Sequence, residues 1–121
     1  MIVTTIGYVL AGLIAAAIIF IGARFIVAPR VAAAGYGVPA DPGAYLTVKG
    51  VRDIASGLIV VILVIAGATY LLGWVMLAAT IIPLADAAIV LRNGGTKAIA
   101  FGVHGATAVL MLLTAALLLI A

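Results

Sequence analysis

The sequence contains no cysteine, which excludes disulfide bonds, thiolate catalysis and cysteine-ligated metal or redox centres. Charged side chains are also scarce, at 7% of the 121 residues against about a quarter in a soluble domain. The net charge of +3 is too small for a nucleic-acid-binding surface, so we expect no nucleic acid partner. Hydrophobic residues make up 69% of the chain, and this composition is typical of a protein that resides in the lipid bilayer.

Four apolar runs are long enough to cross a bilayer as helices, for which about twenty residues suffice. They lie at about residues 2–28, 48–67, 69–91 and 97–121. The last two connections are only a few residues long, so the helices that they join must be antiparallel. The sequence therefore predicts an all-α fold with a single membrane domain: a polytopic membrane protein with four transmembrane helices in an antiparallel bundle.

The long first connection, at about residues 29–47, is rich in proline and glycine, which argues against a continuous helix there. Asp41 before Pro42 predicts a turn in it. Tyr36 and Tyr45 also lie in this linker, and tyrosines are common at the membrane interface. If the linker instead folds over the bundle as a lid, both tyrosines become walls of a pocket.

The positive charges predict how the chain is oriented in the membrane. They flank the first and third connections only, at Arg24, Arg30, Lys49, Arg52, Arg92 and Lys97. The positive-inside rule therefore places these two connections in the cytoplasm and both termini outside, in the cell (inner) membrane. The N-terminus lacks the positive charge of a signal peptide, so we expect the first run to be retained as a membrane helix. This one-sided distribution argues against a transporter that inserts in both orientations.

Each predicted helix carries an ionisable side chain near its cytoplasmic end. At about 1.5 Å of rise per residue, these groups lie roughly 6 to 11 Å below the cytoplasmic boundary. The layer consists of Arg24, Arg52, Asp53, Asp86 and His104. Arg52 and Asp53 point about 100° apart around their helix, so each is expected to find a partner on another helix.

Asp86 is the member of this layer that is hardest to dismiss, because an aspartate inside a membrane helix costs roughly 2.5 to 3.5 kcal/mol and must be paired or protonated. Pro83, earlier in the same helix, cannot donate a backbone hydrogen bond and frees the carbonyl of Ala79, so we expect a kink. Two interpretations stay open. Asp86 belongs to a functional site, or it docks its helix onto Arg24 or Arg52 as an ion-pair partner.

A histidine close to two carboxylates and an arginine can exchange protons near neutral pH. We therefore take as candidate catalytic residues Asp53, Asp86 and His104. The candidate ligand-binding residues are Arg24, Arg52, Tyr36 and Tyr45. One histidine and two carboxylates could ligate a divalent metal, but no helix has the ligand spacing of a motif such as HExxH. We expect no metal site and no other cofactor.

Three functions are compatible with this layer. The first is a one-sided site near the cytoplasmic leaflet that binds a small amphipathic molecule and performs acid/base chemistry on it. The second is transport of a small solute or of protons, with Asp86 beside Pro83 as the coupling site. The third is an accessory or structural subunit whose charges are helix-docking ion pairs. The outer half of the sequence has almost none of the polar groups that a transporter needs, so we rank the one-sided site first.

Small residues on the first predicted helix allow close helix contacts. One face carries Ala11, Ala15 and Gly22, and another carries Gly12 and Ala16. We expect these faces to pack within the bundle or in a parallel homo-oligomer. In the fourth helix, Gly102 and Gly105 are likewise expected to let a neighbouring backbone come close.

The order of the segments and one motif carry a family resemblance. An apolar helix ending in arginine is followed by "AGYGVPA" in the linker and by "KGVRDIASGL" at the start of the second apolar helix. With two closely spaced helices after it, this arrangement resembles the domain-of-unknown-function family 4267, a family of short four-helix membrane proteins. The resemblance implies the fold and the membrane location. It gives weight to Gly50, Arg52, Asp53 and Gly57, and brings no established reaction.

Overall fold

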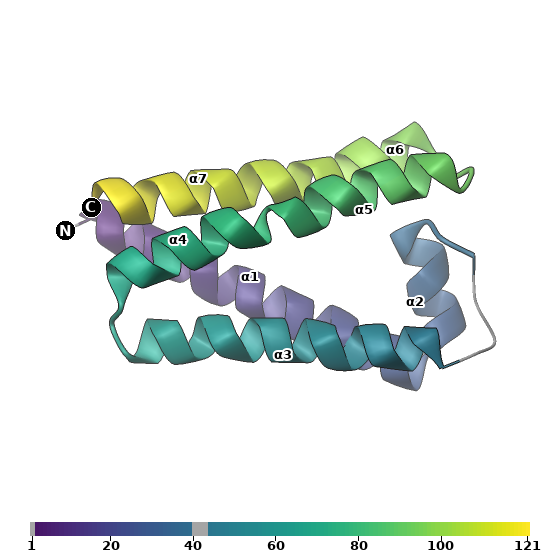
Figure 1. Ribbon diagram of the computed structural model, residues 1–121, viewed down its shortest axis with the longest axis horizontal. Coiled ribbons are helices and arrows are strands. Elements are labelled where there is room, and N and C mark those ends of the chain that lie inside the picture. The colour runs from purple at the N-terminus through teal and green to yellow at the C-terminus, as the bar shows by residue number, and fades with distance from the viewer. Residues whose placement is uncertain (1, 40–43) are drawn as a thin grey trace.

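The computed structural model describes residues 2–39 and 44–121, and every element of regular structure in these ranges is a helix. The elements are α1 (Ile2–Val27), α2 (Pro29–Tyr36), α3 (Tyr45–Ile65), α4 (Thr69–Ala79), α5 (Ile81–Arg92), α6 (Lys97–Ile99), the π-helix η1 (Ala100–Gly105) and α7 (Ala106–Ile120). α5 continues the line of α4, and η1 and α7 continue that of α6, so the chain runs along the long axis and returns twice (Figure 1). Both termini and the α3–α4 turn lie at one end, with α2 and the α5–α6 turn at the other.

The apolar helices are those of a membrane protein. Three stretches of the described chain are long and apolar enough to cross a bilayer: Ile2–Val27, Thr69–Arg92 and Lys97–Ile120. α3 has 21 residues but differs from these three, because its first half carries Lys49, Arg52 and Asp53. The protein is therefore an all-α membrane protein in which one long helix combines a charged half with an apolar half.

Glycines let α1 and α3 approach each other backbone to backbone. A Cβ atom on Gly22 would lie 2.5 Å from the carbonyl oxygen of Gly50, and one on Gly50 would lie equally close to that of Gly22. Gly57 approaches α1 in the same way, at 2.9 Å from the carbonyl oxygen of Ala15. The small-residue face that includes Ala15 and Gly22 is therefore buried within the chain. Gly12, on the other face, has no described atom within 4 Å of its Cβ position.

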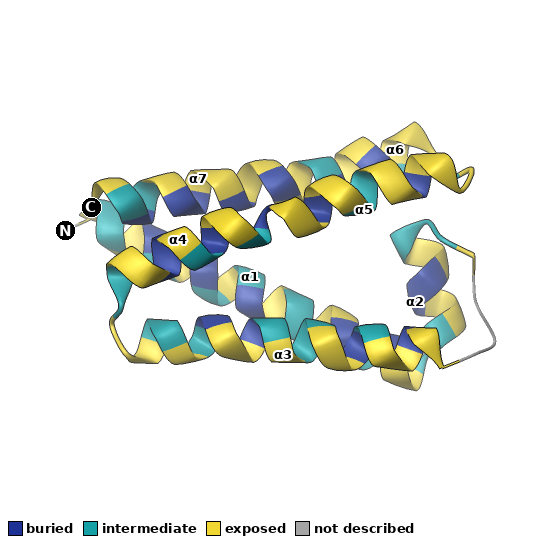
Figure 2. Ribbon diagram, in the orientation of Figure 1, coloured by how far each residue is buried: buried dark blue, intermediate teal, exposed yellow. Residues whose placement is uncertain are grey.

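Two apolar clusters hold the opposite ends of the molecule together. The larger one joins α1, α3, α4 and α7 near the termini and consists of Ala11, Ala15, Val60, Leu72, Met76, Met111, Ala115 and Leu118. The smaller one joins α1, α2 and α3 at the other end and consists of Phe25, Ala32, Ala33 and Leu46. Figure 2 shows buried positions on α4 and α7 where these helices pack together near the termini. Between the two clusters, α3 faces α5 across the middle of the molecule.

The linker contains a helix that the sequence argument did not predict. Pro29 occupies the start of α2, where a missing backbone N–H costs nothing. Gly37 ends it in the left-handed conformation (φ 91°), with its N–H bonded to the carbonyls of Ala33 and Ala34. The next helix begins at Tyr45, three residues before the predicted start at residue 48. The turn expected at Asp41–Pro42 lies outside the described residues.

The third predicted helix is interrupted at Thr80, between α4 and α5, as the position of Pro83 led us to expect. Thr80 is buried, and its hydroxyl donates a 2.9 Å hydrogen bond to the carbonyl of Met76. The fourth predicted helix is interrupted as well, because Ala100–Gly105 is wound as a π-helix. α5, which follows the interruption, packs directly against η1.

The expectation that Gly102 and Gly105 bring another backbone close is wrong. No described atom lies within 4 Å of a Cβ position at Gly102, and the nearest to Gly105 is 3.6 Å away in η1 itself. Close approaches to α7 occur instead at Gly7 and Gly73, against leucine side chains near the C-terminus. The close glycine contacts of α7 therefore lie near the termini and not at Gly102 or Gly105.

Candidate functional site

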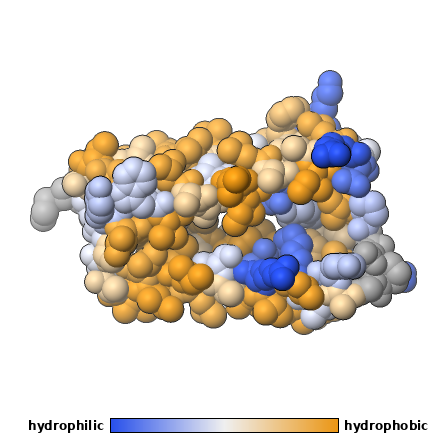
Figure 3. Space-filling model, in the orientation of Figure 1, coloured by the Kyte–Doolittle hydropathy of each residue, from blue (hydrophilic) through white to orange (hydrophobic). Residues whose placement is uncertain are grey.

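A pocket of about 580 Å³ lies between α3 and α5, beside the end of α2. It exists because α3 packs on α1 and α4 whereas α5 packs on η1 and α7, so that α3 and α5 stay apart. Figure 3 shows the hollow between the two halves of the molecule, with hydrophilic side chains gathered at its edge. Its polar wall consists of Tyr36, Tyr45, Lys49, Arg52, Asp53, Ser56 and Asp86. The apolar wall includes Ile59 of α3 and Ile82 of α5.

Lys49 is held by three neighbours at the pocket wall. Its Nζ lies 2.6 Å from Oδ2 of Asp53, one turn further along α3. The same nitrogen lies 4.3 Å from the ring centroids of Phe25 and Tyr36, which is a favourable cation–π geometry on both sides. The expectation that Asp53 pairs with another helix is therefore wrong, because its partner lies on its own helix. The four-residue spacing of lysine and aspartate is the sequence signal for this pair, and the sequence argument used Lys49 only to orient the chain.

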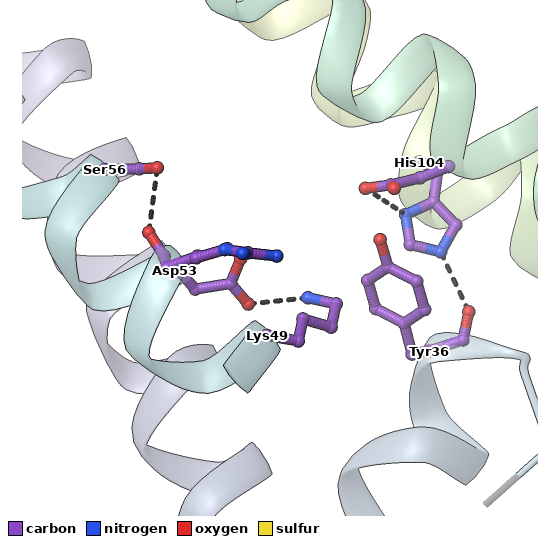
Figure 4. Close-up of polar contacts among 7 residues, drawn as sticks. Tyr36, Lys49, Asp53, Ser56 and His104 are labelled. Atoms are coloured by element: carbon purple, nitrogen blue, oxygen red, sulfur yellow. Dashed lines mark hydrogen bonds and ion pairs between the residues drawn. The ribbon is translucent and has the colours of Figure 1, made fainter. Parts of the chain in front are cut away.

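His104 joins η1 to the end of α2. The residue is buried, with 4% of its surface exposed, and its Nε2 lies 2.9 Å from the backbone oxygen of Tyr36. Because a carbonyl oxygen can only accept a hydrogen bond, Nε2 must carry a proton and be the donor of this hydrogen bond. Nδ1 therefore faces the carboxylate of Asp86, 4.0 Å from Oδ2 (Figure 4). The tautomer of the neutral ring is thus set by the backbone of α2.

Tyr36 lies between Lys49 and His104, as Figure 4 shows, and its ring contacts that of His104 edge-on at 4.3 Å between centroids. Its hydroxyl is hydrogen-bonded to the carboxylate of Asp86. Burial raises the pKa of this hydroxyl far above its ordinary range, and the hydrogen bond and the negative charges of Asp86 and Asp53 raise it further. Tyr36 therefore keeps its proton and donates a hydrogen bond to the carboxylate of Asp86. The partners of Asp86 are Tyr36 and His104, not Arg24 or Arg52.

The two candidate arginines differ in their surroundings. Arg52 lies on the pocket wall, and its guanidinium makes no ion pair or hydrogen bond within the described residues. Its backbone carbonyl accepts a 2.9 Å hydrogen bond from the hydroxyl of Ser56. Arg24 lies elsewhere, with its Cζ 5.9 Å from the ring centroid of Phe20 on the same helix. The structure thus brings Arg52 into the site and leaves Arg24 out of it.

His104 was predicted for this site, but its π-helical setting was not. A π-turn adds a residue to the helix and re-aims the side chains that follow, and such turns are frequent at functional sites. Gly102 and Gly105, which lower the helix propensity around His104, are the accompanying sequence feature. The side chain does not line the pocket itself but stands behind Asp86.

The arrangement offers two kinds of chemistry. Asp86 can accept or release a proton at the pocket wall, with the Tyr36 hydroxyl as a donor and Nδ1 of His104 as an acceptor beside it. Arg52 can hold an oxyanion, because its guanidinium is a planar donor with no protein partner within the described residues. Among the same residues, no group of three or more histidine, aspartate or glutamate side chains is placed to hold a metal ion.

No curated protein matches this chain, and no solved structure does. A match is found with one protein family, described as Domain of unknown function (DUF4267), over residues 15–118. This range runs from the middle of α1 almost to the end of α7, so it contains every residue of the pocket wall. The chain therefore belongs to the DUF4267 family, as its linker and the "GVRDIASGL" segment indicate.

Proposed function

We propose that the protein resides in the cell (inner) membrane and binds a small amphipathic molecule in the pocket between α3 and α5, on which it performs acid/base chemistry. The observation that carries this proposal is the composition of the pocket wall, which joins two carboxylates, a tyrosine hydroxyl and an arginine to apolar side chains. The volume of about 580 Å³ is within the range of roughly 300 to 1,000 Å³ that small-molecule sites occupy. Ionisable groups in a membrane interior are costly and usually functional.

The packing supports a site that opens on one side only. Near the termini, α1, α4 and α7 close around Leu72, Met76 and Leu118, which are fully buried or nearly so. A transporter needs a polar route to both faces of the membrane. The apolar cluster occupies the position that such a route requires, so transport through Asp86 is the weaker candidate.

The proposed membrane arrangement has four spans in an antiparallel bundle, with α3 as the fourth. From Gly57 to Ile65 α3 is wholly apolar, and its charged first half borders the pocket. The termini lie together at one end, and the two connections that carry the lysines and arginines lie at the other (Figure 1). The positive-inside rule then puts α2, the α5–α6 turn and the mouth of the pocket on the cytoplasmic side.

In this site Asp86 is the group that moves the proton. The Tyr36 hydroxyl donates a hydrogen bond to one side of its carboxylate. His104 can exchange a proton with Asp86 only through Nδ1, since Nε2 is tied to the backbone of α2. Asp86 and His104 thus face each other beside the space that the bound molecule would occupy.

Native mass spectrometry of the gently purified protein tests the proposal. We expect a small molecule to be retained by the wild type. Asp86→Asn and Tyr36→Phe, which alter the pocket wall, should reduce this retention at unchanged helix content. Tyr70→Phe is the matched control, because it removes the same hydroxyl from an exposed residue at the opposite end. It should leave retention intact.

The alternative of an accessory subunit predicts a different pattern. If the polar residues only dock helices, the wild type carries nothing small, and both pocket variants lose helix content or unfold at lower temperature. That result would replace the binding site with a structural ion network. Equal retention by all four proteins would show that the molecule binds elsewhere on the surface.

A further inference from the structure

Among the described residues around the pocket, one cation has no counterion. Lys49 is neutralised by Asp53 at 2.6 Å, and Asp86 is shared by Tyr36 and His104. Only Arg52 presents an uncompensated full positive charge to the pocket among the described lining residues. A guanidinium exposed next to the hydrocarbon of a membrane is unfavourable unless an anion meets it.

The pocket wall is itself amphipathic along its length. On α3, Arg52, Ser56 and Ile59 follow at intervals of four and three residues, so they lie on one face of the helix, and all three line the pocket. On α5, Asp86 and Ile82 are one turn apart and line it from the opposite side. Because α3 and α5 run in opposite directions, the charged residues of both lie toward α2 and the isoleucines lie toward the termini (Figure 1).

We propose that the bound molecule is an amphiphile with an oxyanion headgroup, a carboxylate or a phosphate, held by Arg52, with its apolar chain running between Ile59 and Ile82. This inference rests on the proposed binding function and names the class of molecule that the site takes. From Arg52 to Ile59 the helix rises about 10 Å, which accommodates a headgroup and the first several carbons of a chain.

The choice of an anion follows from the chemistry of the arginine. A guanidinium forms two parallel hydrogen bonds with a carboxylate or phosphate, which an uncharged headgroup cannot match. The hydroxyl of Ser56 already donates to the backbone of α3, so it does not compete for the headgroup as a donor. The carboxylate of Asp86 lies on α5, across the pocket from Arg52 on α3, and it accepts a hydrogen bond from the Tyr36 hydroxyl.

The test compares matched ligands in the full-length protein. Native mass spectrometry in detergent measures the affinity for oleate and for oleyl alcohol, which share one chain and differ in headgroup charge. A second pair, dioleoyl phosphatidic acid and dioleoyl phosphatidylcholine, distinguishes a phospholipid headgroup from a free fatty acid. We expect at least one anion of the two pairs to bind about ten- to a hundredfold more tightly than its partner.

Two variants locate the effect. Arg52→Gln should remove the preference for the anion, and Arg52→Lys should restore it only in part, because an ammonium group keeps the charge but loses the two-pronged geometry. Arg92→Gln is the control, since it removes the same charge from an exposed arginine outside the pocket wall. It should leave the preference unchanged.

Each other outcome overturns the inference in a recognisable way. Equal binding of oleate and oleyl alcohol, and of the two phospholipids, keeps the pocket as a binding site but rejects the oxyanion. An equal loss in Arg52→Gln and Arg92→Gln assigns the preference to the basic surface as a whole. No binding of any of the four ligands rejects both this inference and the proposed function. If Arg52→Gln has a lower helix content, the Arg52→Lys variant is used instead. An unchanged preference for the anion in Arg52→Lys rejects the two-pronged contact.

Discussion

Replacing Gly50 by alanine tests the contact that brings α1 and α3 together. The added methyl group would lie 2.5 Å from the carbonyl oxygen of Gly22 and 2.8 Å from Cγ1 of Ile26. Ordinary van der Waals contact begins at 3.4 Å, so the two helices must move about 0.9 Å apart. A backbone oxygen cannot rotate out of the way as a side chain can, so the displacement involves whole helices.

The expected loss of stability follows from two opposing effects. Overpacking costs about 1 to 3 kcal/mol, and a clash with backbone is at the upper end of that range. Alanine has a higher helix propensity than glycine, which recovers about 1 kcal/mol. We therefore expect Gly50→Ala to lower the free energy of unfolding by about 2 kcal/mol.

Equilibrium unfolding in mixed detergent micelles, followed by circular dichroism, measures this difference. Gly12→Ala is the control, because its Cβ position on α1 is open and only the propensity gain applies. It should be as stable as the wild type or slightly more so. Equal stability of both variants would refute the backbone contact between α1 and α3.

Three further predictions concern orientation, coupling and pH. Asn93→Cys should react only with reagents added on the cytoplasmic side and Thr4→Cys only with reagents added outside, each variant holding the only thiol of the chain; the reverse labelling would contradict the orientation. Arg24→Leu and Asp86→Leu should lower the free energy of unfolding additively, because the two side chains do not interact in the described structure; a coupling above about 0.5 kcal/mol in a double-mutant cycle would show that they do. The pKa of Tyr36 is raised by burial, so its contribution to stability is complete below its unfolded value of 10.0 and decreases above it. Above pH 10 the thermal unfolding temperature of the wild type should therefore fall more steeply with pH than that of Tyr36→Phe. Parallel plots of unfolding temperature against pH would refute the raised pKa of Tyr36.

The membrane character and the interruption of the third helix could be predicted, because both depend on local sequence. Long apolar runs determine where helices can cross a bilayer, and Pro83 removes a backbone donor wherever the rest of the chain lies. α2 was also open to prediction, since Pro29 at its start and Gly37 after its end are ordinary boundary signals. The prediction that the linker is not a continuous helix gave more weight to its many glycines and prolines than to these two boundary signals. The π-turn at His104 depends on the packing of η1 against α5, which no spacing in the sequence reports.

The composition of the site was easier to predict than its pairings. Depth along each helix placed Asp53 and Asp86 at one level, and both line the pocket. Depth does not say how each helix is rotated, however, so it also included Arg24, which lies beside Phe20 and outside the pocket wall. The contact between His104 and the backbone of Tyr36 joins residues 68 positions apart and requires the folded linker. Pairings of this kind become visible only in three dimensions.

The glycine contact between α1 and α3 also determines which part of the molecule can give way. Two backbones in direct contact form a stiff frame along one side of the pocket. The other side of the pocket is formed by α5, which begins after the interruption at Thr80 and packs on the π-helix η1. The regular α-helix is broken in both stretches. The pocket thus has one rigid side, formed by α3 on α1, and one side that can bend, formed by α5. If the proposed molecule binds in this pocket, α5 is the side of it that can move to admit the molecule while α1 and α3 stay in place.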